Sequence, residues 1–233
     1  SRAGLGDLVR RRVLRSDLNI CRRLIAPGVR VVAIAVGHTH FDHALDTPTL
    51  VAQHRCPAFG STSLRHLLGL HGLHDHSVVV EPGRPVVAGP FTLTFNRSVH
   101  SRLIAGMRVP AAGELSCEHV DHLTSGSYRC GQVYGIHVEV DGTTLYHQGS
   151  ADLIEDAIRH RGVDVFLAGI AGRNFTERYW ERILPRLDPA AVVPTHYDDF
   201  FVPLDSEMEL MGNARISELT GEGAAVSRDA RVR

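Results

Sequence analysis

The sequence predicts an α/β fold in which a sheet core is covered by helices. Strands and helices alternate near both ends of the chain, and short strands separated by Gly and Pro turns fill the middle. The chain has 233 residues, 43% of them hydrophobic, which is enough to bury a substantial core. We therefore expect a single domain over residues 1–233.

The first third of the chain shows one strand followed by helices. VRVVAIAV (29–36) is apolar and rich in valine, as is typical of a buried strand. A helix is expected to begin at Asp46 or Thr47, with Pro48 in its first turn. PAFGS (57–61) then predicts a short strand, and TSLRHLLGLHG predicts an amphipathic helix that ends at glycine.

The middle of the chain predicts an antiparallel meander. SVVVEPG, RPVVAG, PFTLTFNRSVH and YGIHVEVDGTTLYHQG are short β-rich runs, and Asp141-Gly142 marks a hairpin turn. Residues 101–130 have no clear period, and we expect a long loop or insertion there. The role of His119 and His122, which lie in it, stays open.

The last third returns to alternating elements. SADLIEDAIRHRG (150–162) predicts a helix, VDVFLAGIAG a buried strand, TERYWERILPRL a helix and PAAVVPTHY a further strand.

The densest group of metal-binding side chains follows the first strand, in AVGHTHFDHALDTP. Alternate residues of an extended segment point the same way, so His38, His40 and Asp42 should share one face and His43 should lie opposite. Imidazole and carboxylate are ligands that zinc, iron and manganese prefer. Four such groups on so short a stretch suit two neighbouring ions, although coincidence in a chain with 15 histidines is the alternative.

Three further candidate ligands each follow a predicted strand, where open α/β sheets place their sites. They are His100, Asp152 and His196.

The order H-x-H-x-D-H, a lone His, a Gly-associated Asp and a late His resembles the metallo-β-lactamase superfamily of metal-dependent hydrolases. The match runs from about residue 29 to 205. The runs GIHVEVDGTTLYHQGSAD, VDVFLAGIAG and PAAVVPTHYDDF are most similar to the lactonase-like and N-acyl-phosphatidylethanolamine phospholipase D-like branch. The resemblance implies an αββα sandwich and two divalent metal ions, with zinc first and manganese or iron as alternatives.

The resemblance also implies a ligand set. The first metal would be held by His38, His40 and His100, the second by Asp42, His43 and His196, and Asp152 would bridge both. The bridge departs from the family, in which Asp follows Gly directly, because Gly149 is followed here by Ser150 and Ala151. Capping of the predicted helix is the alternative role for Asp152.

The N-terminus is a second departure. Only 37 residues precede His38, and residues 1–28 look helical, whereas family members begin with several strands. The first β-layer is therefore expected to be incomplete, rebuilt or supplied by a partner, and a homodimer stays open.

A metal pair of this kind implies a hydrolase that uses a metal-bridging hydroxide on a small-molecule ester, lactone or phosphodiester, with Asp42 orienting the nucleophile. Arg173, Asn174 and Tyr197 are candidate substrate contacts. Pairing with a nearby acid is the alternative for Arg173.

The competing functions are an iron-dependent oxidoreductase on the same scaffold, a β-lactamase, a nuclease and a binder without activity. A net charge of −1 argues against nucleic acid as a partner. No apolar run approaches the length of a membrane span, no signal peptide is visible, and four cysteines without a C-x-x-C pair indicate a reducing, cytoplasmic setting.

Overall fold

The computed structural model describes residues 4–103, 108–202, 206–211, 214–226 and 231–232. The chain forms two compact units, and neither unit is a continuous stretch of chain. Unit 1 comprises Ser1–Val80, Ala111–Gln132 and Asp199–Glu209, and unit 2 comprises Glu81–Pro110, Val133–Asp198 and Leu210–Arg233. The single domain expected over residues 1–233 stays a prediction.

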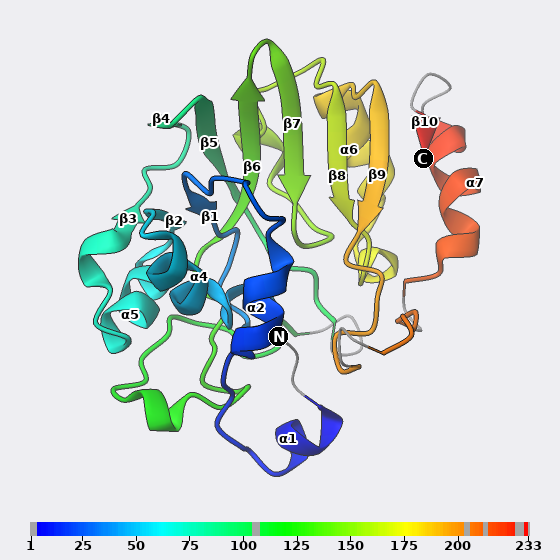
Figure 1. Cartoon of the computed structure of the whole chain (residues 1–233). Coiled ribbons are helices and arrows are strands. Elements are labelled where there is room, and N and C mark those ends of the chain that lie inside the picture. The colour runs from blue at the N-terminus through cyan, green and yellow to red at the C-terminus, as the bar shows by residue number, and fades with distance from the viewer. Residues whose placement is uncertain (1–3, 104–107, 203–205, 212–213, 227–230, 233) are drawn as a thin grey trace. The chain divides into compact units, whose positions relative to one another are not determined.

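Unit 1 combines a small parallel sheet with short helices (Figure 1). The strand order is β1-β2-β3, and both pairs are parallel, so helical crossovers must connect the strands. The strands are β1 (Ile34–Ala35), β2 (Ala58–Gly60) and β3 (Ser77–Val79). The helices are α1 (Leu5–Val9), α2 (Leu18–Leu24), α3 (Phe41–Ala44), α4 (Thr47–His54) and α5 (Thr62–Leu70), with 3-10 turns η1 (His74–His76) and η2 (Val120–His122).

The predicted helix starts of unit 1 are confirmed. α4 begins after Asp46 and has Pro48 in its first turn. α5 begins after Ser61, whose hydroxyl accepts a hydrogen bond of 3.2 Å from the backbone of Leu64. The N-terminal segment is helical in α1 and α2, as the sequence indicates.

The strand expected over residues 29–36 is shorter than predicted. Only β1 is paired as a strand, and one further bond, from the Val36 N–H to the Phe59 carbonyl at 3.0 Å, extends the contact with β2. Because β1 ends here, the histidine-rich segment that follows starts from a point fixed by the sheet.

The core of unit 1 forms where α4 and α5 pack on this sheet. Apolar side chains from the helices, from β2, from Val36 just after β1 and from the 111–132 segment are buried together. The cluster consists of Leu14, Val36, Ala44, Leu45, Val51, Ala58, Leu64, Leu67, Leu68, Leu115, Leu123 and Tyr128.

Unit 2 is built on a seven-stranded sheet of order β10-β9-β8-β7-β6-β5-β4 (Figure 1). β4 to β7 pair antiparallel and β7 to β10 pair parallel, which matches a meander followed by alternating strands and helices. The strands are β4 (Pro85–Ala88), β5 (Phe91–Ser98), β6 (Val133–Val140), β7 (Thr143–Gln148), β8 (Val165–Gly169), β9 (Ala191–Thr195) and β10 (Arg231–Val232). The helices are α6 (Tyr179–Leu187) and α7 (Ile216–Val226), with 3-10 turns η3 (Glu155–Ala157) and η4 (Arg173–Phe175).

The predicted hairpin between β6 and β7 is confirmed. Val140 pairs with Thr143, so Asp141 and Gly142 form a two-residue loop. Both loop residues have positive φ, 48° and 77°, as a type I′ turn requires.

The helix predicted over residues 150–162 is wrong. The structure has only the short 3-10 turn η3 there. The carbonyls of Asp152 and Leu153, which a helix would use internally, accept hydrogen bonds from Gln148 and Arg182 instead. Tertiary contacts therefore override the local helical pattern.

The core of unit 2 lies between the sheet and α6, which runs behind β8 and β9 in Figure 1. Aromatic and aliphatic residues of α6 meet those of β7, β8 and β9, and α7 adds Leu219. The α6 side chains in this cluster are Tyr179, Trp180, Ile183, Leu184 and Leu187.

The described part of segment 101–130 is irregular except for η2, as expected for a long loop. Residues 104–107 lie outside the described residues. Within the described ranges, no helix has the length and apolar character needed to cross a membrane.

Candidate metal centre

The histidine-rich loop follows β1 and is anchored through Thr39, whose side chain is fully buried. The Thr39 N–H donates to the carbonyl of Cys130 at 2.9 Å. Its hydroxyl donates to the carbonyl of Arg129 at 2.6 Å and lies 3.2 Å from that of Cys130. This anchor fixes the backbone between His38 and His40.

The three histidine rings of the loop converge. The ring centroids of His38 and His40 are 4.9 Å apart, at an interplanar angle of 87°. The His38 and His43 centroids are only 4.0 Å apart. The expectation that His43 points to the opposite side is wrong, because the chain turns helical at Phe41 and the His43 N–H bonds back to the His40 carbonyl.

Asp42 completes this cluster. Its Oδ2 lies 3.2 Å from Nε2 of His43. His38 and His40 are buried, whereas the Asp42 and His43 side chains are 13% and 19% exposed, so the cluster is dry at one end and open at the other. Three imidazoles and one carboxylate are a donor set that zinc, manganese or iron accepts.

Cys130, whose carbonyl holds Thr39, is buried. Burial, and then the charge of Asp42, raises the pKa of its thiol to about 12. Nucleophilic attack needs the thiolate, so burial disfavours this cysteine as a nucleophile at neutral pH.

In unit 2, His100 lies two residues after the end of β5 and is 9% exposed. Its Nδ1 lies 2.7 Å from the carbonyl of Ser101. A carbonyl only accepts, so Nδ1 carries the proton and Nε2 is the basic nitrogen of the neutral ring. This is the tautomer that a metal ligand with an Nδ1 hydrogen bond adopts.

His196 follows the end of β9 and is half-buried. Its φ is +57°, a left-handed conformation that is uncommon outside glycine and is often found at functional sites.

Asp152 also lies in unit 2, beyond the end of β7. Its Oδ1 accepts a 2.8 Å hydrogen bond from the Leu153 N–H and lies 3.2 Å from Nη1 of Arg182. The alternative role as a helix cap is wrong, because the helix is absent. The bridging role stays a prediction.

The candidate substrate residues differ in their surroundings. Arg173 is 3% exposed, and its guanidinium donates to Glu222 at 2.7 Å and to the carbonyls of Ala214 and Arg215. It therefore links η4 to α7, which agrees with the alternative of an acid partner, although the arginine itself is buried and the Glu222 side chain is 31% exposed.

The other two candidates lie nearer the surface of unit 2. Asn174 is exposed, and Tyr197 is partly buried against the core cluster. Contact of these residues with a substrate stays a prediction. His119 and His122 are exposed on η2 in unit 1, where His119 lies 3.4 Å from Asp121.

Sequence reasoning missed the contacts that Thr39, Ser101 and Arg182 make with distant parts of the chain. The signal for Thr39 was its place between two candidate ligands, His38 and His40. No local signal marks Ser101 or Arg182, because their partners are 49 and 30 residues away.

Comparisons with known proteins agree with these features. No protein-family model matches the chain. A UPF0173 metal-dependent hydrolase of Staphylococcus aureus strain MRSA252 is 30% identical over 200 residues, which cover 80% of this chain and 74% of the relative. A second UPF0173 protein, from strain JH9, matches to the same extent.

Solved structures show the fold. Igni18, a metallo hydrolase from Ignicoccus hospitalis, superposes with a TM-score of 0.54 at 17% identity, covering 97% of this chain and 83% of Igni18. The metallo-β-lactamase fold protein YhfI from Bacillus subtilis gives 0.51 at 15% identity, covering 87% and 74%. The expected fold class is thereby confirmed.

Proposed function

Because the chain belongs to the UPF0173 family of metal-dependent hydrolases within the metallo-β-lactamase superfamily, we propose that it hydrolyses a small-molecule ester, lactone or phosphodiester at a centre of two divalent metal ions. The observation that carries the proposal is the convergence of His38, His40, Asp42 and His43 in one anchored loop. Zinc is the first candidate metal, with manganese or iron as alternatives.

The loop alone supplies four donors, too few for two ions that each need three or more protein ligands. The proposal therefore takes one donor group to be completed by His100 and the other by His196. By the family resemblance, the two proposed groups are His38, His40 and His100 for one ion, and Asp42, His43 and His196 for the other.

The metals, when bound, would supply Lewis acidity and lower the pKa of a shared water towards neutrality. The protein would supply position and proton transfer. The buried pair His38 and His40 holds one side of the centre dry, which strengthens charge interactions there. Asp42, on the more open side, would take up the proton of the attacking water on a carboxylate oxygen and pass it to the leaving group.

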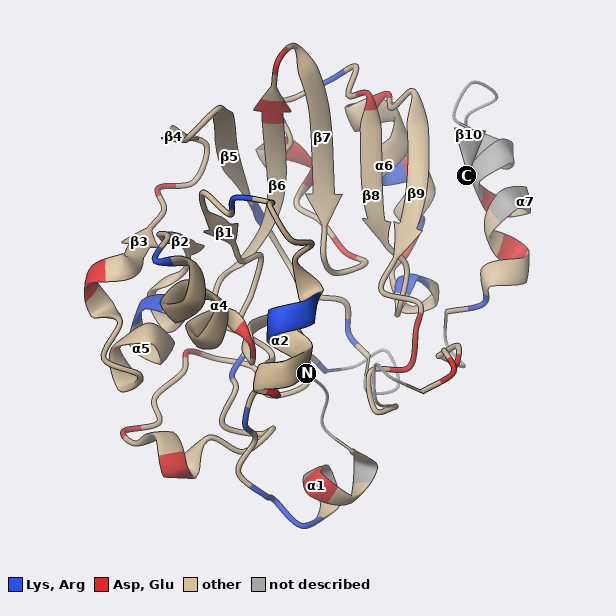
Figure 2. Ribbon diagram, in the orientation of Figure 1, with Lys and Arg blue, Asp and Glu red and all other residues tan. Residues whose placement is uncertain are grey.

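The charge distribution supports a small substrate rather than a nucleic acid. Arginine residues (blue) are interspersed with acidic residues (red) along the ribbon of each unit in Figure 2. Strong nucleic-acid binding needs a basic stripe that neutralises several phosphates.

The test is metal content per chain, measured by mass spectrometry on the whole protein after zinc loading and desalting. We expect about two ions in the wild type. His38→Ala should lose at least one, whereas His71→Ala, which removes an exposed histidine of unit 1, should lose none.

The same samples are assayed with a chromogenic phosphodiester, a lactone and a chromogenic β-lactam. The proposal is supported if the wild type hydrolyses the phosphodiester or the lactone and His38→Ala does not. Turnover of the β-lactam alone would select the β-lactamase alternative. One or two irons with a visible absorption band and no hydrolysis would refute the proposal in favour of an oxidoreductase.

A further inference from the structure

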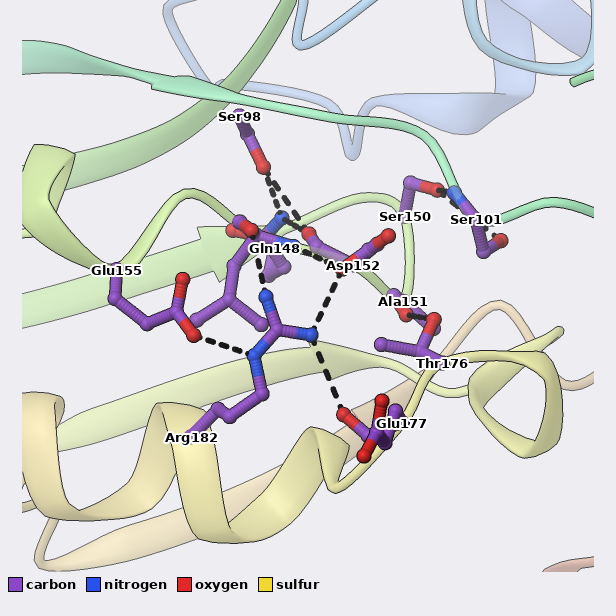
Figure 3. Close-up of polar contacts among 11 residues, drawn as sticks. Ser98, Ser101, Gln148, Ser150, Ala151, Asp152, Glu155, Thr176, Glu177 and Arg182 are labelled. Carbon is purple, nitrogen blue, oxygen red and sulfur yellow. Dashed lines mark hydrogen bonds and ion pairs between the residues drawn. The ribbon is translucent and has the colours of Figure 1, made fainter.

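The turn after β7 carries Gly-Ser-Ala-Asp at residues 149–152. Ser150 therefore occupies the position directly after the glycine, and the acid, Asp152, comes two residues later. Figure 3 shows that the backbone of this turn is held from several sides. Gln148 Nε2 and the Ser98 hydroxyl donate to the carbonyl of Asp152, at 2.6 and 3.1 Å. The Thr176 hydroxyl donates to the carbonyl of Ala151 at 2.5 Å. The directions of the side chains are therefore fixed as well.

The carboxylate of Asp152 is engaged with Arg182 and with its own backbone. Oδ1 accepts from the Leu153 N–H at 2.8 Å and lies 3.2 Å from Arg182 Nη1. Arg182 also donates to Glu155 at 2.5 Å and to the Leu153 carbonyl at 3.0 Å. The pKa of Glu155 is lowered to about 2, and the hydrogen bond from Arg182 contributes most to this shift.

Arg182 thus lies between two carboxylates and ties α6 to the turn (Figure 3). A carboxylate whose charge is balanced by an arginine is a poorer ligand for a cation than an unpaired one.

Ser150 lies on the other side of the same turn, against the segment that carries His100. It is 5% exposed, and its Oγ accepts a 3.0 Å hydrogen bond from the Ser101 N–H. The carbonyl of Ser101 in turn holds Nδ1 of His100 at 2.7 Å. One peptide segment therefore connects the serine hydroxyl to the histidine ring.

Resting on the proposed function, we infer that Ser150, and not Asp152, is the residue of this turn that serves the metal centre. Ser150 is a positioning residue: it holds Ser101, and Ser101 orients His100. Asp152 is a structural anchor for Arg182 and does not bridge the ions. The centre then has one negative charge fewer than a carboxylate-bridged pair and should hold its metals less tightly.

The test uses the whole protein loaded with zinc. Metal content and the chelator concentration that removes half of it are measured together with the melting temperature in EDTA. The variants are Asp152→Asn, Arg182→Gln, Ser150→Ala and Ser150→Asp.

We expect Asp152→Asn and Arg182→Gln to behave alike, because each breaks the same ion pair. Both should lower the melting temperature in EDTA and leave the wild-type metal content. Asparagine keeps an oxygen for the Leu153 N–H, so this variant should fold. For Ser150→Ala, the chelator concentration that removes half of the metal should be about tenfold lower than for the wild type. For Ser150→Asp, it should be about tenfold higher.

Loss of one metal in Asp152→Asn while Arg182→Gln keeps both would overturn the inference, because it would show Asp152 to be a ligand. An unchanged chelator midpoint in both Ser150 variants would also overturn it. Failure of the proposed function looks different: the wild type itself would then hold no zinc, or His38→Ala would not reduce it.

Discussion

Replacing Thr39 by valine tests whether a single buried hydroxyl holds the metal-binding loop in place. Valine has nearly the same shape and keeps the N–H that bonds to the Cys130 carbonyl. It removes the hydroxyl that donates to the Arg129 carbonyl at 2.6 Å. The carbonyl then loses a donor in a site that Thr39, fully buried, closes to water.

The cost follows from the desolvated acceptor. A buried polar group left without its partner costs ~1–3 kcal/mol, so we expect the free energy of unfolding to fall by about 2 kcal/mol. For a chain of this size that corresponds to a melting temperature lower by roughly 4–8 °C. Because His38 and His40 flank the anchor, the variant should also release zinc at about tenfold less chelator.

The assay is urea unfolding of the metal-free protein, with a chelator titration of the zinc-loaded protein beside it. Thr39→Ser is the matched control, since it keeps the hydroxyl and loses only a methyl group, which costs about 1 kcal/mol. It should hold zinc as tightly as the wild type. Equal zinc retention by the valine and serine variants would refute the role that we give to the hydroxyl.

Three further predictions concern unit 2. Burial, and then the His160 ring stacked 3.7 Å away, lowers the pKa of His137 from 6.5 to about 4. As the pH falls, the unfolded chain therefore protonates at His137 before the folded chain does, and the free energy of unfolding decreases between about pH 6.5 and 4. His137→Gln should reduce this decrease, which urea melts at pH 7, 5.5 and 4.5 would measure. Gly135→Ala should cost about 1–3 kcal/mol in the same melts, because its Cβ would collide with the buried tyrosine hydroxyl across the strand pair, and an unchanged midpoint would contradict that packing. Arg173→Gln should cost about 3 kcal/mol, because the carbonyls of Ala214 and Arg215 lose the buried guanidinium that donates to them. Asn174→Ala, on the exposed neighbour, should stay within about 0.5 kcal/mol, and the reverse order would restore Arg173 as a surface residue.

The sequence predicts elements well where the signal is local. The cap and proline at Asp46 and Pro48, and the Asp141-Gly142 turn, depend on residues a few positions apart, and the structure confirms them. The helix expected over residues 150–162 failed because its deciding contacts come from Arg182 and Ser98. Such contacts are invisible to a pattern read over a dozen residues.

The candidate site divides in the same way. The four donors of the loop after β1 were predicted from their spacing, and the structure brings them together. Their directions could not be predicted, because the change from extended to helical backbone at Phe41 turns His43 back towards His38. The surroundings of Arg173 were likewise hidden, since its acid partner lies 49 residues further along the chain.

The discontinuous make-up of the two units has a consequence for how the protein is made. Unit 1 needs residues 199–209 to be complete, and unit 2 needs those after 210, so neither can finish folding until nearly the whole chain has left the ribosome. At about 5–20 residues per second, residue 80 waits roughly 6–24 s for residue 199. The nascent loop with its three histidines spends that time without its final neighbours, within reach of cellular metal ions, chaperones and proteases.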